Sequence, residues 1–388
     1  MTAGSLEDMA GGLLTIDLGA LAANYLDLAR RAAPAKTAAV VKADAYGLGA
    51  ERVGMALEEA GCEHFFVAHL HEALSLRPAL SPKARIYVLN GLQPGSESAC
   101  AQADVIPVIN GMDQARLWRA LAQRVGAVLP AVIQIDSGMA RLGLSAGDLD
   151  ELVAEDTFFK HVSLVLTMSH LACSDEPNAA SNAEQLARFA RLADRLPAAP
   201  RSLANSGAVF LSPANHWDIV RPGVSLYGGA PHVGSNPMRA VVRLEAKVIQ
   251  VRDLKAGDGV GYGLSYARPT PGQIATIAVG YADGWPRHLS NRGAAYYRGV
   301  RLPIAGRVSM DSITLDVTEL AARGLSLALG ERVELLGPAQ TLEMVAHDAG
   351  TIAYEILTNL GRRYHRTYVE AIDMPKLSLK TYAARAHQ

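Results

Sequence analysis

Lys42 ends a short apolar run and is followed by the segment Ala43-Asp44-Ala45-Tyr46-Gly47. If the run is a buried strand, the amine lies at the carboxyl end of that strand, where barrel enzymes carry out their chemistry. Partial burial disfavours the charged ammonium and lowers its pKa from about 10.4. An uncharged amine there can form a Schiff base. A lysine that merely extends from a strand end into solvent is an equally good interpretation of this segment alone.

Small residues follow two later apolar runs, in Asn205-Ser206-Gly207 and in Arg221-Pro222-Gly223. Barrel enzymes often bind phosphate with the loops after strands seven and eight, using backbone N–H groups and small side chains. The pattern therefore favours a phosphorylated ligand. Arg141, in a glycine-containing loop after another run, could hold an anion or could be a surface arginine.

The histidines and cysteines give a weaker signal. His64, His69 and His71 have no carboxylate–thiol set beside them, so surface or capping roles are favoured and we predict no metal site. The three cysteines are far apart, which indicates neither a disulfide framework nor a zinc site.

The elements that must position these residues alternate between short apolar runs and longer segments of helical spacing. Eight runs read as buried strands: Thr37–Val41, His64–Ala68, Arg85–Leu89, Val105–Ile109, Ala131–Ile135, Val162–Met168, Arg201–Ala204 and Asp218–Leu226. Eight strands with crossovers predict an α/β fold, a (β/α)8 TIM barrel, over residues 12–240. An open doubly wound sheet is the alternative, because periodicity does not show closure.

After about residue 240 the pattern changes to alternating strands separated by glycine-containing turns. We predict a mostly β C-terminal domain over residues 241–388, with a helix near Leu342–Leu360. The expected strands are Val241–Val251, Gln273–Val279, Ala294–Tyr297, Ser312–Val317 and Arg332–Leu336.

Composition excludes several classes of protein. The 388 residues carry 37 basic and 38 acidic side chains, which argues against a nucleic-acid-binding protein. No apolar run reaches the ~18 residues of a membrane span, so we expect no membrane partner. The N-terminus lacks the basic start and apolar stretch of a secretory signal, and a cytoplasmic enzyme is predicted.

Taken in order along the chain, the motifs resemble the alanine racemase family, whose members use pyridoxal 5'-phosphate. The segments that carry the resemblance are Val41–Gly47, Asp136–Gly143, Ser169–Ala172, Ala204–Ser206, Val220–Gly223, Leu226–Gly228, Gly261–Gly263, Gly280–Gly284, Gly306–Asp311 and Tyr354-Glu355. The resemblance implies a homodimer of a barrel and a β domain, with shared active sites.

The resemblance also implies a two-base mechanism that interconverts L-alanine and D-alanine. Lys42 would hold the cofactor as an internal aldimine and act as base on one face. Tyr262, from the other subunit, would serve the opposite face. His170 and Arg221 would connect the tyrosine to the cofactor ring. Because arginine does not readily give up its proton, the ring nitrogen would stay unprotonated.

Other positions match the family's cofactor and substrate contacts. The resemblance places Asn205 among the cofactor-binding positions and assigns the phosphate to Tyr46, Ser206, Gly223, Val224 and Tyr354. Arg141 would contact the cofactor's phenolic oxygen and the substrate carboxylate. Met310 of the partner chain would donate a backbone amide to that carboxylate, and Tyr281 would line a narrow entrance. Gln134 departs from the pattern, because many members carry a carbamylated lysine there.

Two other functions are compatible with parts of the sequence. A decarboxylase would use the same barrel and cofactor, but Arg221 does not suit an electron sink. A cofactor-carrying barrel without enzymatic activity would leave the C-terminal domain without a purpose. The racemase, supplying D-alanine for peptidoglycan or serving alanine catabolism, is the function that we predict.

Overall fold

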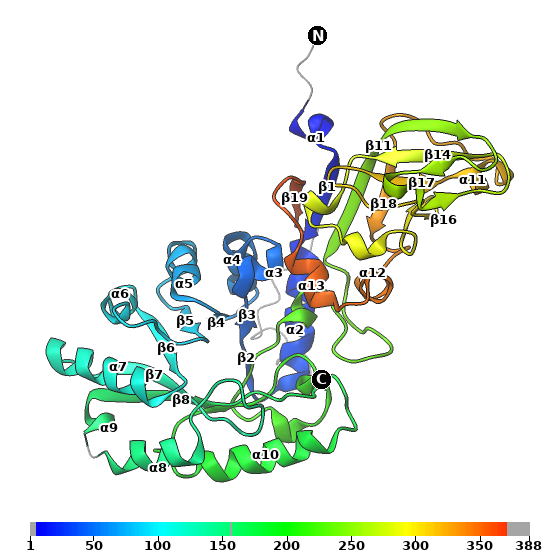
Figure 1. The fold of residues 1–388 in the computed structure, drawn as a ribbon. Coiled ribbons are helices and arrows are strands. Elements are labelled where there is room, and N and C mark those ends of the chain that lie inside the picture. Colours follow the sequence, from blue (N-terminus) through cyan, green and yellow to red (C-terminus); the bar gives the residue numbers. More distant parts are fainter. Residues whose placement is uncertain (1–4, 156, 371–388) are drawn as a thin grey trace, which may run out of the picture. The chain divides into compact units, whose positions relative to one another are not determined.

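The computed structural model describes residues 5–155 and 157–370 and divides into two compact units (Figure 1). The barrel unit comprises Leu21–Leu226 and Ala230–Met238. The second unit contains the first described residues up to Ala20, together with Tyr227–Gly229 and the chain from Arg239 onward. Residues 371–388 of the predicted C-terminal domain lie outside the described residues.

The barrel unit is built on parallel strands in sequential order from β3 to β9. Their bounds are β3 (Ala39–Val40), β4 (His64–Val67), β5 (Arg85–Val88), β6 (Val105–Ile109), β7 (Leu129–Gln134), β8 (Val162–Met168) and β9 (Arg201–Ser202).

The sheet closes on itself through an eighth strand, β10 (Ile219–Val220). The amide of Asp218 donates to the Arg201 carbonyl at the edge of β9. On its other side, β10 pairs with β2 (Lys36–Thr37), and the Val40 amide of β3 donates to the Pro222 carbonyl. The predicted barrel is confirmed, and the open sheet is excluded.

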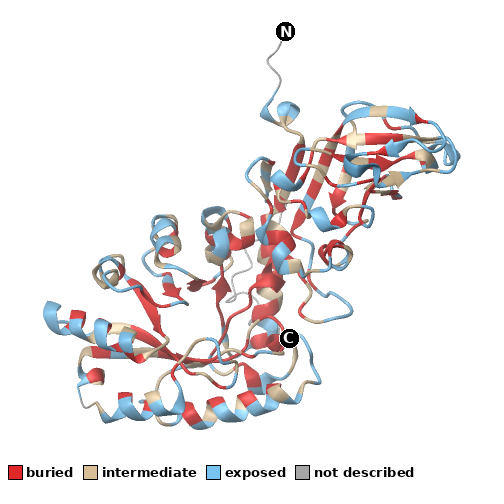
Figure 2. Ribbon diagram, viewed as in Figure 1, coloured by how far each residue is buried: buried red, intermediate tan, exposed pale blue. Residues whose placement is uncertain are grey.

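The right-handed helices of the barrel unit cover the outside of these strands. They are α2 (Leu18–Ala32), which begins in the second unit, α4 (Ala50–Glu59), α5 (Leu70–Leu76), α6 (Glu97–Gln102), α7 (Met112–Val125), α8 (Ala146–Ala154), α9 (Phe158–His161) and α10 (Ala180–Ala193). The short element α3 (Lys42–Gly47) follows β3 and is left-handed. Helix α7 shows the reason, since Ala115, Trp118 and Leu121 at helical spacing are all buried. Figure 2 shows buried strands and helices whose outer faces are exposed. Among the described residues, no helix combines the length and apolar character needed to cross a bilayer.

The second unit is mostly β. Its main sheet has the order β16-β15-β18-β11-β1-β19, and β14 joins β11 to β17. The strands are β1 (Gly12–Asp17), β11 (Val242–Leu254), β14 (Gly272–Ile277), β15 (Ala294–Tyr297), β16 (Val300–Pro303), β17 (Ile313–Asp316), β18 (Arg332–Leu336) and β19 (His365–Val369), with the hairpin β12 (Gly259–Val260) and β13 (Tyr266–Ala267). Its helices are α1 (Leu6–Met9), α11 (Thr318–Ala322), α12 (Leu342–Ala349) and α13 (Ala353–Thr358).

Three local predictions differ from the structure. Strand β1 pairs with β11 and β19, so Gly12–Asp17 lies in the second unit, although the predicted boundary of 12–240 grouped it with the barrel. The predicted strand Asp218–Leu226 is regular only over β10, because Pro222 and Gly223 lead into the 3-10 turn Val224–Tyr227. The predicted helix Leu342–Leu360 is two helices, since Gly350 adopts a left-handed φ of 71° and ends α12.

A buried histidine lies in the barrel wall. His64 of β4 is 5% exposed, and its Nδ1 lies 2.9 Å from the Tyr87 hydroxyl, while no described residue bonds its Nε2. Burial, with the charges of Lys36 and Arg85, lowers the pKa of His64 to about 4. The imidazole is therefore neutral in the folded protein and charged in the unfolded chain at mildly acidic pH.

This difference predicts a loss of stability in acid. Between the unfolded pKa of about 6.5 and the folded pKa of about 4, the unfolded chain binds more protons, so stability falls as pH falls. Urea unfolding at pH 7.5 and 4.5 should show that His64→Gln removes about 2–3 kcal/mol of the pH-dependent loss. The exposed-site control His71→Gln should behave like the unsubstituted protein. An equal loss in His64→Gln and the control would contradict the assignment.

Candidate active site

Lys42 begins a single turn of left-handed helix. Ala43, Asp44, Ala45 and Tyr46 all have φ between 53° and 55°, and Gly47 follows with φ of 83°. For L-residues this conformation costs roughly 1–2 kcal/mol per residue, so the surrounding structure must hold the turn in place. Such stored strain is typical of functional sites.

Two carboxylates hold the turn. Glu72 at the start of α5 accepts the Ala43 amide at 2.6 Å with one oxygen and the Ala68 amide at 2.7 Å with the other. Asp44 accepts the Ala50 amide at 2.8 Å and so joins the turn to α4. These hydrogen bonds connect the turn to Glu72 after β4 and to α4, the helix that follows the turn.

The position of the turn places the Lys42 amine in an electropositive, half-buried environment. Burial is the largest cause that lowers the pKa of Lys42, and the nearby Arg141 guanidinium lowers it further, while Glu72 acts in the opposite direction. The lowered pKa makes the neutral amine, which is the nucleophilic form, easier to reach than in a free lysine. This agrees with the Schiff-base interpretation of the sequence.

Arg141 lies in a loop after β7 that is organised by Asp136. The Asp136 Oδ1 accepts the amides of Gly138, Met139 and Ala140 at 2.9–3.1 Å. Gly143 is required here because φ is 110° and a Cβ would lie 2.6 Å from the Asp136 nitrogen. No described residue forms an ion pair with Arg141, and none bridges it to Gln134, which is buried at the end of β7.

Arg221 and His170 lie close together at the carboxyl ends of β10 and β8. Arg221 is 3% exposed, donates to Ser202 Oγ and to the Ser169 carbonyl at 2.6 Å, and pairs with no carboxylate among the described residues. Burial lowers its pKa to about 9, so it stays charged at neutral pH. Burial, then the charges of Arg221, Arg141 and Lys42, lower the pKa of His170 to about 3, which keeps the imidazole neutral.

A third group of residues packs against the left-handed turn. The amides of Gly223 and Ser225 donate to Ser206 Oγ at 2.9 and 3.3 Å. A Cβ at Gly223 would lie 2.2 Å from the Tyr46 hydroxyl, so only glycine fits beside this tyrosine. Asn205 and Val224 flank the same loops, and the Asn205 side chain accepts the Ala208 amide. The structure thus brings together nine predicted residues in the barrel unit: Lys42, Tyr46, Arg141, His170, Asn205, Ser206, Arg221, Gly223 and Val224.

The other four predicted residues lie in the second unit. Tyr262 is at the turn between β12 and β13, where Gly261 and Gly263 both have positive φ, and it is 71% exposed. Tyr281 and Met310 lie on adjacent loops, joined where the Tyr281 amide donates to the Ser309 carbonyl at 2.9 Å. Tyr354 is exposed on α13.

Sequence reasoning missed the residues that support the site. Glu72 and Ser202 contact predicted residues but belong to none of the motifs named above, and Ser169 lies in a named motif but was given no role of its own. Glu72 carried a usable signal, because an acidic residue three positions after a helix start typically caps that start, and it accepts the His69 amide at 3.0 Å.

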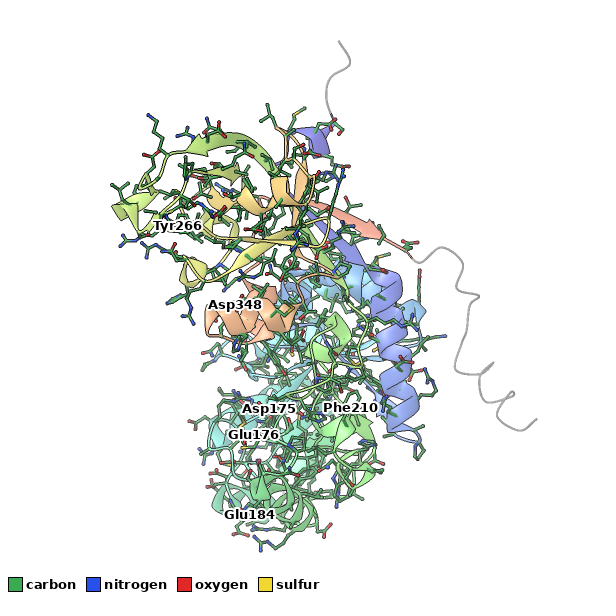
Figure 3. All side chains as sticks on the ribbon, turned by 90° about the vertical axis from the view of Figure 1, so that its right-hand side faces the viewer. Asp175, Glu176, Glu184, Phe210, Tyr266 and Asp348 are labelled. Carbon is green, nitrogen blue, oxygen red and sulfur yellow. The ribbon has the colours of Figure 1, made fainter. Side chains whose placement is uncertain are left out.

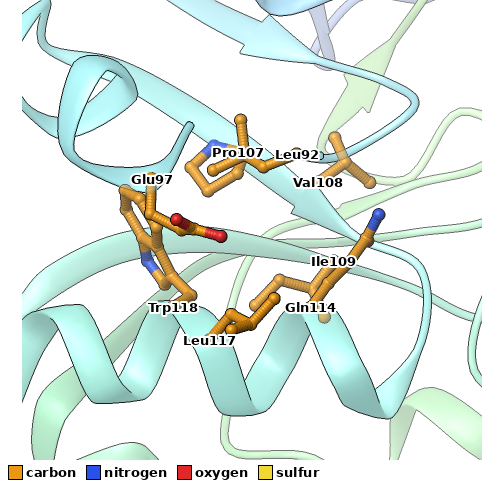
Figure 4. A pocket seen from close by; sticks show the side chains of 8 residues that line it. All are labelled: Leu92, Glu97, Pro107, Val108, Ile109, Gln114, Leu117 and Trp118. Carbon is orange, nitrogen blue, oxygen red and sulfur yellow. The ribbon is translucent and has the colours of Figure 1, made fainter. Parts of the chain in front are cut away.

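Other clusters in the barrel unit do not compete with this site. A small apolar pocket between α6, β6 and α7 is lined by Trp118, Leu117 and Pro107 among others, and by none of the predicted residues (Figure 4). Three acidic side chains lie near the start of α10: Asp175 and Glu176 precede this helix, and Glu184 lies within it (Figure 3). None of the three is a predicted site residue. Within the described ranges, no group of three or more His, Cys, Asp or Glu side chains could hold a metal ion.

Comparison with known proteins is decisive. The N-terminal domain model of alanine racemase matches residues 16–231, and the C-terminal domain model matches residues 241–368. The chain belongs to the alanine racemase family. An "Alanine racemase, catabolic" of Agrobacterium fabrum is 56% identical over 362 residues, with 93% of each chain covered. An alanine racemase of Brucella canis is 54% identical over 374 residues, covering 93% of this chain and 94% of that protein.

Solved alanine racemase structures have the same fold. The structure of alanine racemase from Bartonella henselae, with covalently bound pyridoxal phosphate, has a TM-score of 0.90 and 45% identity, and the match covers 93% of this chain and 100% of that one. The biosynthetic alanine racemase of Pseudomonas aeruginosa has a TM-score of 0.86 at 36% identity, with 93% and 100% covered. The predicted family and its two-part architecture are confirmed.

Removal of the Glu72 carboxylate should destabilise the left-handed turn. In Glu72→Ala three amides lose their acceptor, which should cost about 1–3 kcal/mol in urea unfolding and accelerate hydrogen exchange at Ala43. The control Glu59→Ala, at an exposed end of α4, should stay within about 0.5 kcal/mol of the parent. If Glu72→Ala matches this control, the turn does not depend on the carboxylate.

Proposed function

We propose that this family member interconverts L-alanine and D-alanine with pyridoxal 5'-phosphate bound at Lys42, as a homodimer with shared active sites. The observation that carries the proposal is the half-buried, low-pKa amine of Lys42 at the head of a strained turn, in a chain that belongs to this family. A decarboxylase and a non-enzymatic cofactor carrier are disfavoured, because the matches cover both parts of a racemase.

The residues present fit the cofactor. Lys42 Nζ would bind it covalently. The phosphate would be held by Tyr46, Ser206, Gly223, Val224 and Tyr354, and Asn205 would contact the cofactor as well. The absence of a Cβ at Gly223 lets the Tyr46 hydroxyl lie close beside it. When bound, the cofactor withdraws electrons from the substrate Cα and acidifies its proton.

Inversion at Cα requires a proton donor and acceptor on each face of the substrate. Lys42 Nζ, whose pKa burial and the Arg141 charge lower, removes or returns the proton on one face. Tyr262 of a second copy serves the other face. Its 71% exposure and its position on a turn with three positive-φ residues support presentation to a partner rather than burial in its own unit.

A free phenol has a pKa near 10, so a tyrosine that acts as a base needs a neighbour that donates a hydrogen bond to its phenolate. His170 suits this role, because burial and then the charges of Arg221, Arg141 and Lys42 keep it neutral, and a neutral imidazole has one N–H to donate. Arg221 would continue the chain to the ring nitrogen of the cofactor. Since it remains cationic, it cannot protonate that nitrogen, and electron withdrawal by the ring is limited.

The substrate carboxylate needs positive charge and amide donors. Arg141, which has no ion-pair partner among the described residues, supplies the charge, and Met310 of the second copy supplies a backbone N–H. Tyr281 narrows the entrance to the substrate site and so excludes larger amino acids. Steric exclusion of one methylene is worth only about 1–3 kcal/mol, so bulky amino acids are rejected more strongly than serine.

Two physiological roles are compatible with this reaction. The names of the relatives from Agrobacterium fabrum and Rhizobium johnstonii include "catabolic", which supports a role in consuming D-alanine in the cytoplasm. Supply of D-alanine for peptidoglycan is the other role. Growth of a deletion strain on D-alanine, with and without D-alanine supplementation, separates the two.

The first experiment is chiral analysis of L-alanine incubated with purified protein, with and without pyridoxal 5'-phosphate. We expect a racemic mixture and much slower turnover of serine. Production of carbon dioxide without D-alanine would contradict the proposal and favour decarboxylation.

Tyr262→Phe tests the second base. The variant should keep the cofactor attached but lose at least ~10²-fold in racemisation, the usual contribution of a general base. Absorbance of bound cofactor provides the control for an intact Lys42 site. Full activity in Tyr262→Phe would end the two-base proposal.

Arg221→Glu tests the charge beside the ring nitrogen. A carboxylate there should stabilise a protonated ring and increase transamination, measured as pyruvate formed per racemisation event. Arg221→Lys retains the positive charge and should keep the parent's ratio of transamination to racemisation. The same ratio in Arg221→Glu would show that this charge does not control which reaction occurs.

A further inference from the structure

Three loops of the second unit meet at one arginine. Arg363 donates through Nε and Nη2 to the two carboxylate oxygens of Asp283, at 2.6 and 2.9 Å, and through Nη1 to Asp311 at 2.7 Å. We call Arg363, Asp283 and Asp311 the Arg363 clamp. It joins the loop 280–284, which carries Tyr281, to the loop 309–312, which carries Met310.

The same loops lie backbone against backbone. The Tyr281 and Ala282 amides donate to the Ser309 and Met310 carbonyls at 2.9 and 3.0 Å. A Cβ at Gly280 would lie 2.3 Å from the Met310 carbonyl oxygen, and one at Gly284 would lie 1.6 Å from that of Asn359. Side chains are thus excluded, and a small shift of one loop moves the other.

The clamp is stronger than an ordinary surface ion pair. Asp283 is 3% exposed, and the Gly280 amide also donates to its Oδ2 at 2.8 Å. A two-pronged arginine–carboxylate contact adds both energy and direction. Asp311 is exposed, so its single bond contributes orientation more than stability.

We propose that Arg363 is a positioning residue that fixes Tyr281 and Met310 and thereby sets the affinity for alanine and the exclusion of larger amino acids. The inference rests on the proposed function, in which these two residues contact the substrate. Arg363 itself donates only to Asp283 and Asp311 among the described residues, so it acts through the loops.

The test compares Arg363→Gln, Arg363→Lys and the neighbouring control Arg362→Gln in the complete, cofactor-loaded protein. In Arg363→Gln we expect KM for L-alanine to rise about tenfold with kcat reduced less than about threefold, because uniform binding is lost. The ratio of serine to alanine turnover should rise. Arg363→Lys, whose amine reaches one carboxylate, should give a KM between those of Arg363→Gln and the parent. Arg362→Gln should have the KM and kcat of the parent.

Hydrogen exchange gives a measurement that needs no substrate. Amides in 280–284 and 309–312 should exchange faster in Arg363→Gln, while those of β11 and β18 stay unchanged. Unchanged hydrogen exchange would show that Arg363 does not hold the two loops, whether or not the parent protein racemises alanine. Faster exchange with unchanged KM and selectivity, in a parent that does racemise alanine, would overturn the positioning role while leaving the proposed function intact.

Discussion

The left-handed turn at Lys42 is the constraint on which the site depends. Four consecutive non-glycine residues hold a conformation that L-residues avoid. The hydrogen bonds of Glu72 and Asp44 and the close packing of Tyr46 on Gly223 stabilise them in it. The turn links two parts of the site, since its first residue is Lys42 and its fifth, Tyr46, packs on Gly223 beside Ser206. A straight continuation of the strand into an ordinary helix would separate them.

Charge is the second determinant of the site. Lys42, Arg141 and Arg221 all act on His170, and each lowers its pKa. The barrel end therefore gathers positive charge, which Glu72 offsets only in part at Lys42 and which an anion would stabilise. Under the proposed function, the phosphate of the cofactor and the carboxylate of the substrate would provide that compensation. Burial acts in the same direction as these charges, so the His170 imidazole is neutral and the pKa of Lys42 is lowered.

Local sequence patterns predicted most of the barrel strands but not the residues that hold the candidate site in place. Buried strands such as Val105–Ile109 are recognisable because burial on both faces demands continuous apolar residues. Lys42 was visible as a lysine at a strand end. The left-handed turn was not, since Ala43, Asp44, Ala45 and Tyr46 carry no local signal for positive φ and are held by tertiary contacts. Glu72 and Arg363 act through partners distant in sequence, which periodicity does not detect. The predicted boundary of 12–240 grouped Gly12–Asp17 with the barrel for the same reason, because β1 pairs with strands distant in sequence.

Strand β1 imposes an order on the formation of the molecule. Leu14 pairs on one side with Leu244 and on the other with Arg366, so both neighbours of this strand are translated long after it. During synthesis on the ribosome, the barrel can complete its own hydrogen bonds while β1 remains an unpaired edge. The central pair of the second unit, β1 with β11, can form only after residue 254 has emerged, and β19 completes the other side of β1 last. Nascent chains that stall before β11 would therefore leave β1 with both of its edges unpaired.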